Sequence, residues 1–436
     1  MTAVTKLNKN PVSPKGLQTG QTQLQDLLDT YRPGHSLPAL YYRSPDVWEA
    51  DRKLVLSDVW HLAGHESRIP EPGDYFVLEL LGEAVIVTRD NDRKVRAFFN
   101  NCRHRGSPLC LNKSGRTKAF VCPYHAWTYS LDGRLKGAPL MQPGFEKSDY
   151  GLYQCHVATI EGIIFINLAD EPVEDFDAVY SPFADVLKLY GVRNTKIAHI
   201  WSYRLEANWK HVIENGVECY HCPATHPELC STRSTQNLKS IGLVPEQADQ
   251  TDIAKFKREV ETWQSQIANR PDLVGMLVDD DENSTHLRNL SRYPLKAGFL
   301  SESKDGRPVS LPLGNLGAHE GSSAIGVFNP WSWAWILDDY VVLHRWSAVG
   351  PETTEIELTW LVREDAEEGR DYNLDDLLYV NKITTLQDKD LILMSRNGCR
   401  SDRYQPGPFS RQERLVDQFC RWYTNKLKSR YAGSFA

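Results

Sequence analysis

Two short cysteine–histidine motifs constrain this chain more than any other feature of its sequence. The first is Cys102-Arg-His104, and after seventeen intervening residues the second is Cys122-Pro-Tyr-His125. Two thiolates and two imidazoles in this pattern suit a [2Fe–2S] cluster in which the cysteines hold one iron and the histidines the other. The motifs therefore predict a small β domain that presents two metal-binding turns at hairpin tips near its surface.

Zinc is the alternative occupant of these four side chains, because Zn²⁺ takes the same ligand types. Zinc sites usually pair two cysteines in one turn and two histidines in the other, whereas here each turn carries one of each. Residues 106–108 (Gly-Ser-Pro) supply a turn after the first motif. Three aromatic residues near the second can shield a cluster from water: Tyr124, Trp127 and Tyr129. The sequence favours a Rieske-type cluster, a one-electron relay, over zinc.

A second concentration of metal-ligand types lies at residues 208–226. Asn208 can cap a helix that begins at Trp209. His221 and His226 lie five residues apart, and Pro223 between them interrupts the helical hydrogen bonds. The two imidazoles can therefore converge on one metal from a helix end and the turn that follows it.

Two histidines and one carboxylate form the facial triad of non-haem Fe(II) oxygenases, which leaves metal positions open for O₂ and substrate. The carboxylate must come from elsewhere in the chain, and a helical segment near residues 386–393 offers two. Asp388 is the expected iron ligand and Asp390 the alternative. A lone aspartate on a helix is usually solvated surface, but a histidine pair and a cluster motif in the same chain argue for a ligand.

With these motifs, the chain resembles the terminal oxygenase (α) subunits of Rieske non-haem iron oxygenases, from about Tyr41 to Tyr423. The second half of the resemblance is Asn-Trp-Lys…Glu-Asn…Glu-x-x-His-x4-His. It implies an α+β fold, with a small all-β Rieske [2Fe–2S] domain placed before or within a larger catalytic domain of mixed antiparallel sheet and helices. It also implies that Glu218 bridges His221 to a cluster histidine of a neighbouring subunit, and Asn215 is a further candidate catalytic residue.

Most members of the family have aspartate at the bridging position. Glutamate there, within Glu-Cys-Tyr-His-Cys, resembles the branch that oxidises quaternary ammonium compounds, such as glycine betaine monooxygenases, stachydrine demethylases and carnitine oxygenases. The run 401–410 also resembles the betaine demethylases. The chain departs from them at Gly216, where they have asparagine, and at 396–398, which reads Arg-Asn-Gly instead of Gln-Arg-Gly. Both departures concern the substrate rather than the iron chemistry.

The resemblance implies an enzyme that uses O₂ and electrons passed from NAD(P)H by a flavin/iron–sulfur reductase, and that assembles as a head-to-tail homotrimer. The expected reaction is N-demethylation or hydroxylation of a small quaternary ammonium compound such as a betaine. Two alternatives stay open: a Rieske oxygenase of an aromatic acid or aryl ether, acting by ring dihydroxylation or O-demethylation, and a non-catalytic Rieske electron carrier.

Three tryptophans at alternate positions are candidate contacts for such a substrate: Trp331, Trp333 and Trp335. Period-two alternation in a strand predicts that all three lie on one face. Aromatic faces bind quaternary ammonium groups by cation–π attraction. The alternative is that these indoles are core.

The composition excludes some classes of function. The formal net charge of −7 argues against general nucleic-acid binding. The sequence has no run of about 18 apolar residues, so we expect no membrane span. The N-terminus also lacks the apolar core of a signal peptide. Seven cysteines lie outside the cluster motif, and we expect them to be reduced packing residues, Cys219 and Cys222 included. These features predict a cytoplasmic protein.

The expected organisation is a flexible N-terminal arm (1–20), N-terminal helices that pack on the catalytic domain (21–60), the Rieske domain (61–172) and the catalytic domain with its mononuclear iron (173–436). Strands are predicted near 75–81, 84–88 and 163–168, with three or four more between 325 and 362. Helices are predicted at 208–221, 374–397 and 411–428. The polar region 232–320 is expected to hold mobile loops over the site, and its elements cannot be placed.

Overall fold

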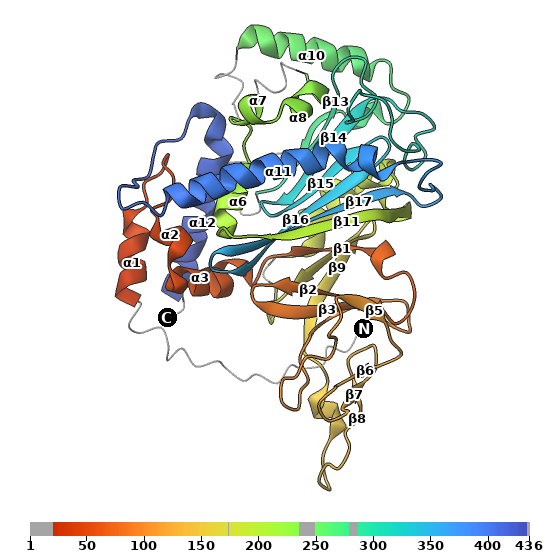
Figure 1. Ribbon diagram of the computed structural model, residues 1–436, viewed down its shortest axis with the longest axis vertical. Helices are drawn as coiled ribbons and strands as arrows, with labels where there is room; N and C mark the ends of the chain where they lie inside the picture. Colours follow the sequence, from red (N-terminus) through yellow and green to blue (C-terminus); the bar gives the residue numbers. More distant parts are fainter. Residues whose placement is uncertain (1–20, 173, 235–248, 279–286, 434–436) are drawn as a thin grey trace.

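The computed structural model describes residues 21–172, 174–234, 249–278 and 287–433. The predicted arm at 1–20 and the acidic run at 279–282 lie outside the described residues. In these residues two seven-stranded sheets and one three-stranded sheet account for the strands, and most of the helices lie around the second large sheet (Figure 1). This arrangement confirms the predicted α+β class, a small β part followed by a larger part of antiparallel sheet and helices.

The first part is built from strands, as the short β-branched runs predict. Its large sheet has the order β1-β10-β9-β4-β3-β2-β5 and antiparallel pairing throughout. In β2 (Asp74–Leu80), buried residues alternate with half-buried ones, so one face packs on the core. The other strands are β1 (His61–His65), β3 (Glu83–Arg89), β4 (Val95–Phe99), β5 (Ser114–Arg116), β9 (Gln154–Ile160) and β10 (Ile163–Asn167).

A three-stranded sheet carries the second cysteine–histidine motif. It consists of β6 (Phe120–Val121), β7 (Thr128–Tyr129) and β8 (Leu135–Gly137). The predicted hairpin at Asp132-Gly133 joins β7 to β8, and Gly133 has φ +86°. Its backbone lies so close to the Phe98 ring that a Cβ would overlap it, so glycine is required on both counts.

The second large sheet, with the order β11-β17-β16-β15-β14-β13-β12, forms the body of the second part. Four of its strands lie where the sequence predicts them: β14 (Ser322–Asn329), β15 (Ser332–Leu337), β16 (Val341–Gly350) and β17 (Thr353–Arg363). The others are β11 (Thr195–Leu205), β12 (Gly275–Val278) and β13 (Asn289–Pro294). The long helix α11 (Leu374–Gly398) crosses one face of this sheet (Figure 1).

Helices from both ends of the chain meet at the side of this sheet. The helices α1 (Gln21–Thr30), α2 (Leu40–Arg43) and α3 (Pro45–Ala50) lie beside α12 (Arg414–Gly433), and all share one apolar cluster with α6 (Trp209–Gly216). Asn208 caps α6 as predicted, by accepting a hydrogen bond of 3.0 Å from the amide of Lys210.

A buried ion pair fixes α6 against these helices. The Lys210 ammonium donates to the Asp51 carboxylate, and neither side chain is exposed. The same carboxylate accepts from the Trp209 indole at 3.1 Å and from the Tyr423 hydroxyl at 2.5 Å. A buried charge is tolerated only when it is paired and hydrogen-bonded, so these contacts set the place of α6 in the fold.

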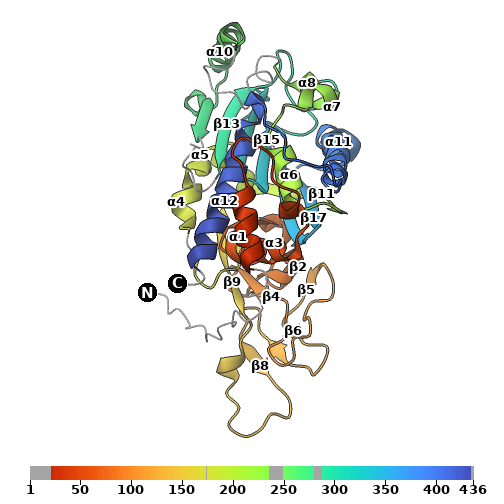
Figure 2. The same ribbon diagram turned by 90° about the vertical axis from the view of Figure 1, so that its left-hand side faces the viewer.

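The two candidate metal regions lie far apart in the molecule. The three-stranded sheet is at the lower end of Figure 1, whereas α7 (Cys222–Thr225) and α8 (Pro227–Thr232) lie in its upper half, and Figure 2 shows the same order from the side. The helix α10 (Gln250–Gln264) lies against β13, where the Phe256 ring contacts Tyr293. Two shorter helices, α4 (Phe176–Tyr180) and α5 (Ala184–Leu189), follow the first part.

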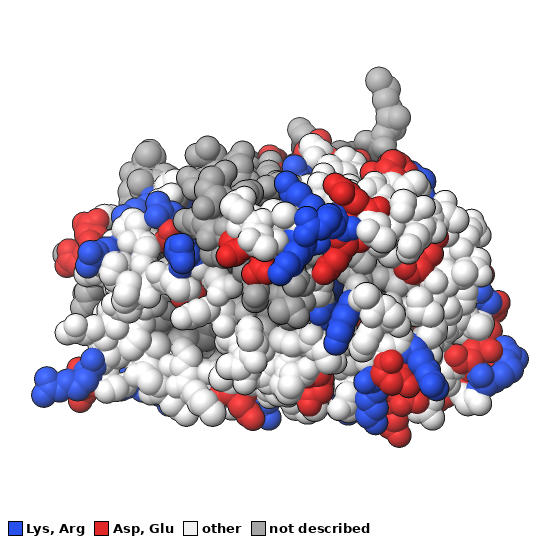
Figure 3. Space-filling view, turned by 90° about the horizontal axis from the view of Figure 1, so that it is seen from above, with Lys and Arg blue, Asp and Glu red and all other residues white. Residues whose placement is uncertain are grey.

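The apolar content of the helices and the charges on the surface indicate which kinds of partner the chain can bind. Within the described ranges, no helix combines the length and the apolar composition that a membrane crossing requires. Lysine and arginine alternate with aspartate and glutamate over the face seen in Figure 3, without a field of one sign. Among the described residues of this face, the charges therefore do not form the basic patch typical of a nucleic-acid interface.

Candidate metal centres

The structure brings the four residues of the cysteine–histidine motifs together. Cys102 and Cys122 share one apolar cluster, and the Nδ1 atoms of His104 and His125 are 3.2 Å apart. The cysteines are 3% and 2% exposed, whereas both histidines are exposed. A cluster held here would have a buried sulfur side and an exposed imidazole side, as a relay that meets its partners at the surface requires.

The two motif turns share one backbone design. In each turn the cysteine amide donates to a carbonyl five residues later, Ser107 in the first and Trp127 in the second, at 2.8 Å in both. The residue four positions after each cysteine has positive φ: Gly106 at +76° and Ala126 at +57°. A non-glycine residue in this region is strained, so the second turn is held in shape by its surroundings.

Aromatic side chains cover both turns. His104 stacks on Trp127 with ring centroids 4.9 Å apart, and His125 stacks on Tyr124 at 3.9 Å. The Tyr129 hydroxyl lies 3.3 Å from Cys102 Sγ and accepts from the Arg103 amide at 3.1 Å. Sequence reasoning treated Tyr129 as a shield only and missed this contact with the sulfur.

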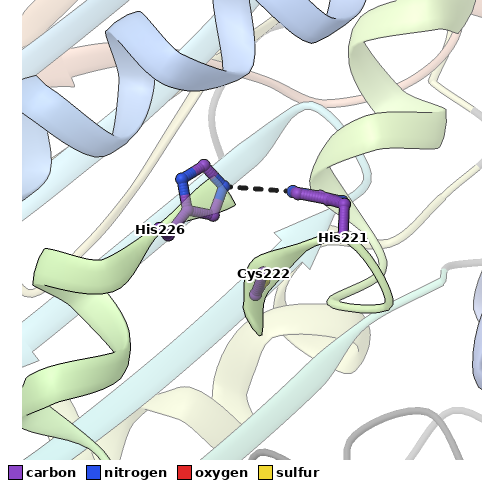
Figure 4. A group of neighbouring side chains, drawn as sticks. All are labelled: His221, Cys222 and His226. Carbon is purple, nitrogen blue, oxygen red and sulfur yellow. Dashed lines mark hydrogen bonds between the residues drawn. The ribbon is translucent and has the colours of Figure 1, made fainter. Parts of the chain in front are cut away.

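The second group of candidate ligands converges from three elements. His221 precedes α7, His226 lies between α7 and α8, and Asp388 lies on α11. The Nε2 atoms of the histidines are 3.1 Å apart, and Asp388 Oδ1 is 3.0 Å from that of His226 and 3.2 Å from that of His221. Figure 4 shows the two imidazoles turned toward each other.

This triangle has the size of one face of a six-coordinate metal. Ligand atoms about 2.1 Å from a metal and at right angles to one another are separated by about 3.0 Å. Two nitrogens and one carboxylate oxygen also match the donor set of a non-haem Fe(II) centre with open positions. The residues therefore fit a mononuclear iron.

Asp390, the alternative carboxylate, is exposed and belongs to a different side of α11. Two residues along a helix correspond to a rotation of about 200°, so Asp388 and Asp390 cannot face the same metal. The fold places Asp388 with the two histidines.

Each histidine is oriented through its outer nitrogen. Nδ1 of His221 donates to Glu218 at 2.5 Å, and Nδ1 of His226 donates to the Gln387 carbonyl at 2.8 Å. The Gln387 amide in turn donates to Glu228 at 2.9 Å. Such contacts fix which nitrogen carries the proton and leave Nε2 free to bind a metal. Sequence reasoning missed Gln387 and Glu228, although Gln387 directly precedes Asp388.

The same contacts shift the ionisation of the triad. Burial lowers the pKa of His221, but hydrogen bonds to Asp388 and Glu218 outweigh it and raise the pKa to about 9. Burial also raises the pKa of Asp388, but the two imidazoles outweigh it and hold the pKa below its ordinary value. The site thus attracts positive charge, and a metal that binds there displaces protons.

Asn215 and Gly216 lie in the last turn of α6. Asn215 is half-buried, and the partners that orient the two histidines are Glu218 and Gln387 rather than Asn215. A Cβ at Gly216 would overlap the Trp346 ring. The glycine that stands in the place of an asparagine therefore lets the indole pack directly under the helix that leads to His221.

The prediction that three tryptophans share one face is wrong for Trp331. Trp333 and Trp335 lie in β15 on one face, where their rings lie 5.1 Å from Trp346 and 6.0 Å from His344. Trp331 precedes the strand and packs in another cluster, 5.9 Å from Trp422. The strand begins one residue after Trp331, so strand alternation does not extend to it.

The prediction that Cys219 and Cys222 are reduced packing residues is also wrong, because the two form a disulfide. Their Cα atoms are 4.9 Å apart, a separation that a disulfide can span. The bond closes a four-residue ring that contains Tyr220 and His221. The remaining cysteines of the described residues are free, as expected.

Comparisons with known proteins give the class of this chain. The family of the ring hydroxylating alpha subunit (catalytic domain) matches residues 192–429, and the Rieske [2Fe-2S] domain matches residues 59–161. The chain belongs to the Rieske non-haem iron oxygenases, as an α subunit. The class has a Rieske [2Fe–2S] cluster and a mononuclear iron, uses O₂ and receives its electrons from a reductase, so the predicted enzyme class and cofactors are confirmed.

Among its relatives is the glycine betaine monooxygenase oxygenase subunit of Chromohalobacter salexigens, 34% identical over 93% of this chain and 88% of the relative. A shorter match is the carnitine monooxygenase oxygenase subunit of Acinetobacter baumannii, 34% identical over 44% of this chain and 53% of that protein. The fold is similar to that of the quaternary ammonium Rieske monooxygenase CntA solved with L-carnitine. That match has a TM-score of 0.66 and 20% identity, and covers 93% of this chain and 98% of the other.

Proposed function

We propose that this chain is the terminal oxygenase of a monooxygenase that N-demethylates or hydroxylates a small quaternary ammonium compound such as a betaine. The observation that carries the proposal is the triangle of His221, His226 and Asp388, with Glu218 on the outer nitrogen of His221. Relatives that match almost the full chain and are named glycine betaine monooxygenase oxygenase subunits support the substrate class.

The proposed ligand assignment follows the geometry. Cys102, His104, Cys122 and His125 hold the [2Fe–2S] cluster, and the triad holds the iron, which when bound supplies O₂ activation. Glu218 and Gln387 keep each Nδ1 protonated, so each Nε2 presents a lone pair to the metal. Asn215 is proposed as a further catalytic-site residue because of its place in the family motif.

Electron transfer is proposed to cross between subunits. One chain places the sheet that carries its second cluster motif at the lower end of the molecule, and the helices that carry its triad in the upper half (Figure 1). A head-to-tail homotrimer would bring the exposed His104 or His125 of one subunit to Glu218 of the next, and such closed rings follow from heterologous interfaces. Glu218 lies beside Tyr220, which is 56% exposed, so a neighbour can reach this turn.

Aromatic side chains on the sheet face support a cationic substrate. Trp333 lies opposite His344 in the β15–β16 pairing, and Trp346 is two residues further along the same face. These rings and Trp335 lie on the side of the sheet that packs against α6 at Gly216. A trimethylammonium group cannot donate a hydrogen bond, and each cation–π contact contributes about 0.5–2 kcal/mol.

The reaction balances on an N-methyl group. One oxygen atom of O₂ enters the C–H bond and the other leaves as water. NAD(P)H supplies two electrons and one proton through a flavin/iron–sulfur reductase, and the second proton comes from solvent. The hydroxymethyl product then loses formaldehyde and leaves the demethylated amine. Because NAD(P)H and its reductase are the source of electrons, we propose that the enzyme acts in the cytoplasm. We propose neither a nucleic acid nor a membrane as a partner.

The test supplies the purified chain with a reductase, NADH and paired substrates. We expect O₂ uptake and formaldehyde release with a trimethylammonium compound, and binding of its neutral tert-butyl analogue that is weaker by at least about fivefold. Formaldehyde only from aryl methyl ethers, or dihydroxylation of an aromatic acid, would replace the proposal with the aromatic alternative. Two irons per chain and no O₂ uptake would indicate an electron carrier.

A further inference from the structure

A cysteine sulfur lies within reach of the proposed iron site. Cys222 directly follows His221, and its Sγ lies within 4.8 Å of a ring nitrogen of His221 and of His226. The residue is only 4% exposed, and its sulfur is bonded to Cys219. Neither cysteine has a part in the function proposed above.

We propose that Cys222 is a latent fourth ligand of this metal site, masked by the disulfide with Cys219 and released when that bond is reduced. The inference rests on the proposed function only in that His221, His226 and Asp388 must bind a metal. The disulfide then prevents Cys222 Sγ from binding a metal until the bond is reduced.

The two redox states offer a metal different donor sets. A disulfide sulfur carries no charge, whereas a thiolate is the form in which cysteine binds metals. With Cys222 masked, two nitrogens and one oxygen leave metal positions open, which suits an Fe(II) oxygenase. With Cys222 free, four protein ligands form a closed set of two nitrogens, one oxygen and one sulfur, which suits tetrahedral Zn²⁺. The disulfide therefore keeps the site open and disfavours zinc.

Exposure determines where a reductant attacks. Cys219 is half-buried and Cys222 is buried, so a dithiol reductant reaches the Cys219 sulfur first. Its thiolate forms a mixed disulfide with Cys219, and Cys222 leaves as a thiolate. The second thiol of the reductant then displaces Cys219 and completes a two-electron, two-proton reduction. The reductant leaves as its own disulfide.

A peroxide restores the bond with balanced atoms. One cysteine thiolate attacks a peroxide oxygen and becomes a sulfenic acid, and the other thiol displaces water from it. With hydrogen peroxide the sum is two thiols and one peroxide giving one disulfide and two waters. Reduction by a dithiol and oxidation by a peroxide thus interconvert the two states.

The chain provides matched variants for a test. Cys219→Ser leaves Cys222 permanently free, whereas Cys222→Ser removes the candidate ligand in both redox states. Cys230→Ser is the control, because Cys230 is a free thiol in the same neighbourhood, with Sγ 3.5 Å from the Cys222 carbonyl, and lies outside the group of three.

Each full-length protein is stripped of mononuclear metal with a mild chelator that spares the cluster, and is then titrated anaerobically with Co²⁺ and Zn²⁺. Cys219→Ser should show a thiolate-to-cobalt charge-transfer band and bind Zn²⁺ at least about tenfold more tightly than Cys222→Ser. The wild-type protein and Cys230→Ser should show the band only after phosphine reduction. Alkylation and mass spectrometry count the free thiols in each state.

The outcomes separate this inference from the proposed function. Co²⁺ binding to Cys219→Ser without the band, at the affinity of Cys222→Ser, would overturn the fourth ligand and leave the triad in place. Free Cys219 and Cys222 thiols in the wild-type protein after peroxide treatment would overturn the masking. If none of the four proteins binds Co²⁺, the proposed triad fails, and the inference fails with it.

Discussion

The two candidate metal regions are built in opposite ways. The cluster motif buries its two sulfurs and exposes its two imidazoles at the end of the β part. The triad has one almost fully buried imidazole, His226 at 1%, and two partly buried side chains, His221 at 18% and Asp388 at 25%. A relay must come close to its partners, whereas a site that activates O₂ gains from excluding water. The difference in exposure therefore matches the difference in proposed role.

The two regions also differ in what holds their side chains. The cluster motif depends on two tight turns whose hydrogen bonds are made within a few residues of each cysteine. The triad depends on side chains from α11 that meet residues about 160 positions earlier in the chain: Asp388 and Gln387 contact His226. One site is held by local backbone geometry and the other by tertiary packing.

The largest expected effect separates the two sites by removing one ligand. Asp388→Ala should remove the mononuclear iron and lower turnover by at least about a thousandfold, because the oxygen chemistry requires the metal. The cluster should remain visible and reducible. Asp390→Ala, two residues away and exposed, is the matched control and should keep both centres. Iron analysis with electron paramagnetic resonance checks both variants, and iron loss in the control alone would reassign the ligand.

The next effect concerns the proposed link between the sites. Glu218→Gln should keep iron and a reducible cluster but lower turnover by about 10–100-fold, because a carboxamide cannot accept at both positions as the carboxylate does. Glu218→Asp retains the charge and should recover part of the rate. Single-turnover oxidation of the pre-reduced cluster measures the transfer step directly, and an unchanged rate in Glu218→Gln would remove this residue from the electron path.

A smaller effect is expected on the reduction potential of the cluster, when a side chain beside its buried sulfur ligands is changed. The Tyr129 hydroxyl lies 3.3 Å from Cys102 Sγ. A hydrogen bond donated to a thiolate that holds the cluster should stabilise the reduced, more negative cluster. Tyr129→Phe should therefore lower the midpoint potential by tens of millivolts, with little change in iron content. Tyr124→Phe is the control, because that ring stacks on His125 and does not contact the sulfur. Equal potentials in the two variants, measured by redox titration, would show that the hydroxyl does not tune the cluster.

The smallest effect on the two metal regions concerns the support of α6, where the change is one of stability. Burial raises the pKa of Glu214 to about 8, and its carboxyl lies 2.8 Å from the Tyr42 hydroxyl. The folded protein therefore holds this proton between pH of about 4.5 and 8, where the unfolded chain has released it. The stabilisation is complete below that window and is lost as pH rises, by up to about 1.4 kcal/mol per pH unit.

Glu214→Gln cannot ionise, so its melting temperature should fall less than that of the wild-type protein between pH 5.5 and pH 8.5. Thermal unfolding of both proteins at each pH provides the measurement. Parallel pH profiles would show that Glu214 is ionised in the folded protein, contrary to the expected shift.

Local sequence patterns predicted several elements well. The helix expected at 374–397 is observed at Leu374–Gly398, and Asn208 caps α6, because capping and apolar periodicity are properties of neighbouring residues. The helix α10 (Gln250–Gln264) was not predicted. Its apolar residues recur at helical spacing, at Ile253, Phe256, Val260 and Trp263. They lie within a strongly charged segment, however, and none of the residues of the helix is buried.

The sequence by itself predicted the chemistry proposed for both candidate sites, because ligand types and their spacing within a turn are properties of neighbouring residues. Only the tertiary structure decided between Asp388 and Asp390, since the choice depends on which side of α11 faces α7 and α8. It also decided that Gln387 and Glu228 orient His226, that Trp331 leaves the aromatic face, and that Cys219 meets Cys222. Each of these depends on how a side chain is directed in the fold, which residue order alone leaves undetermined.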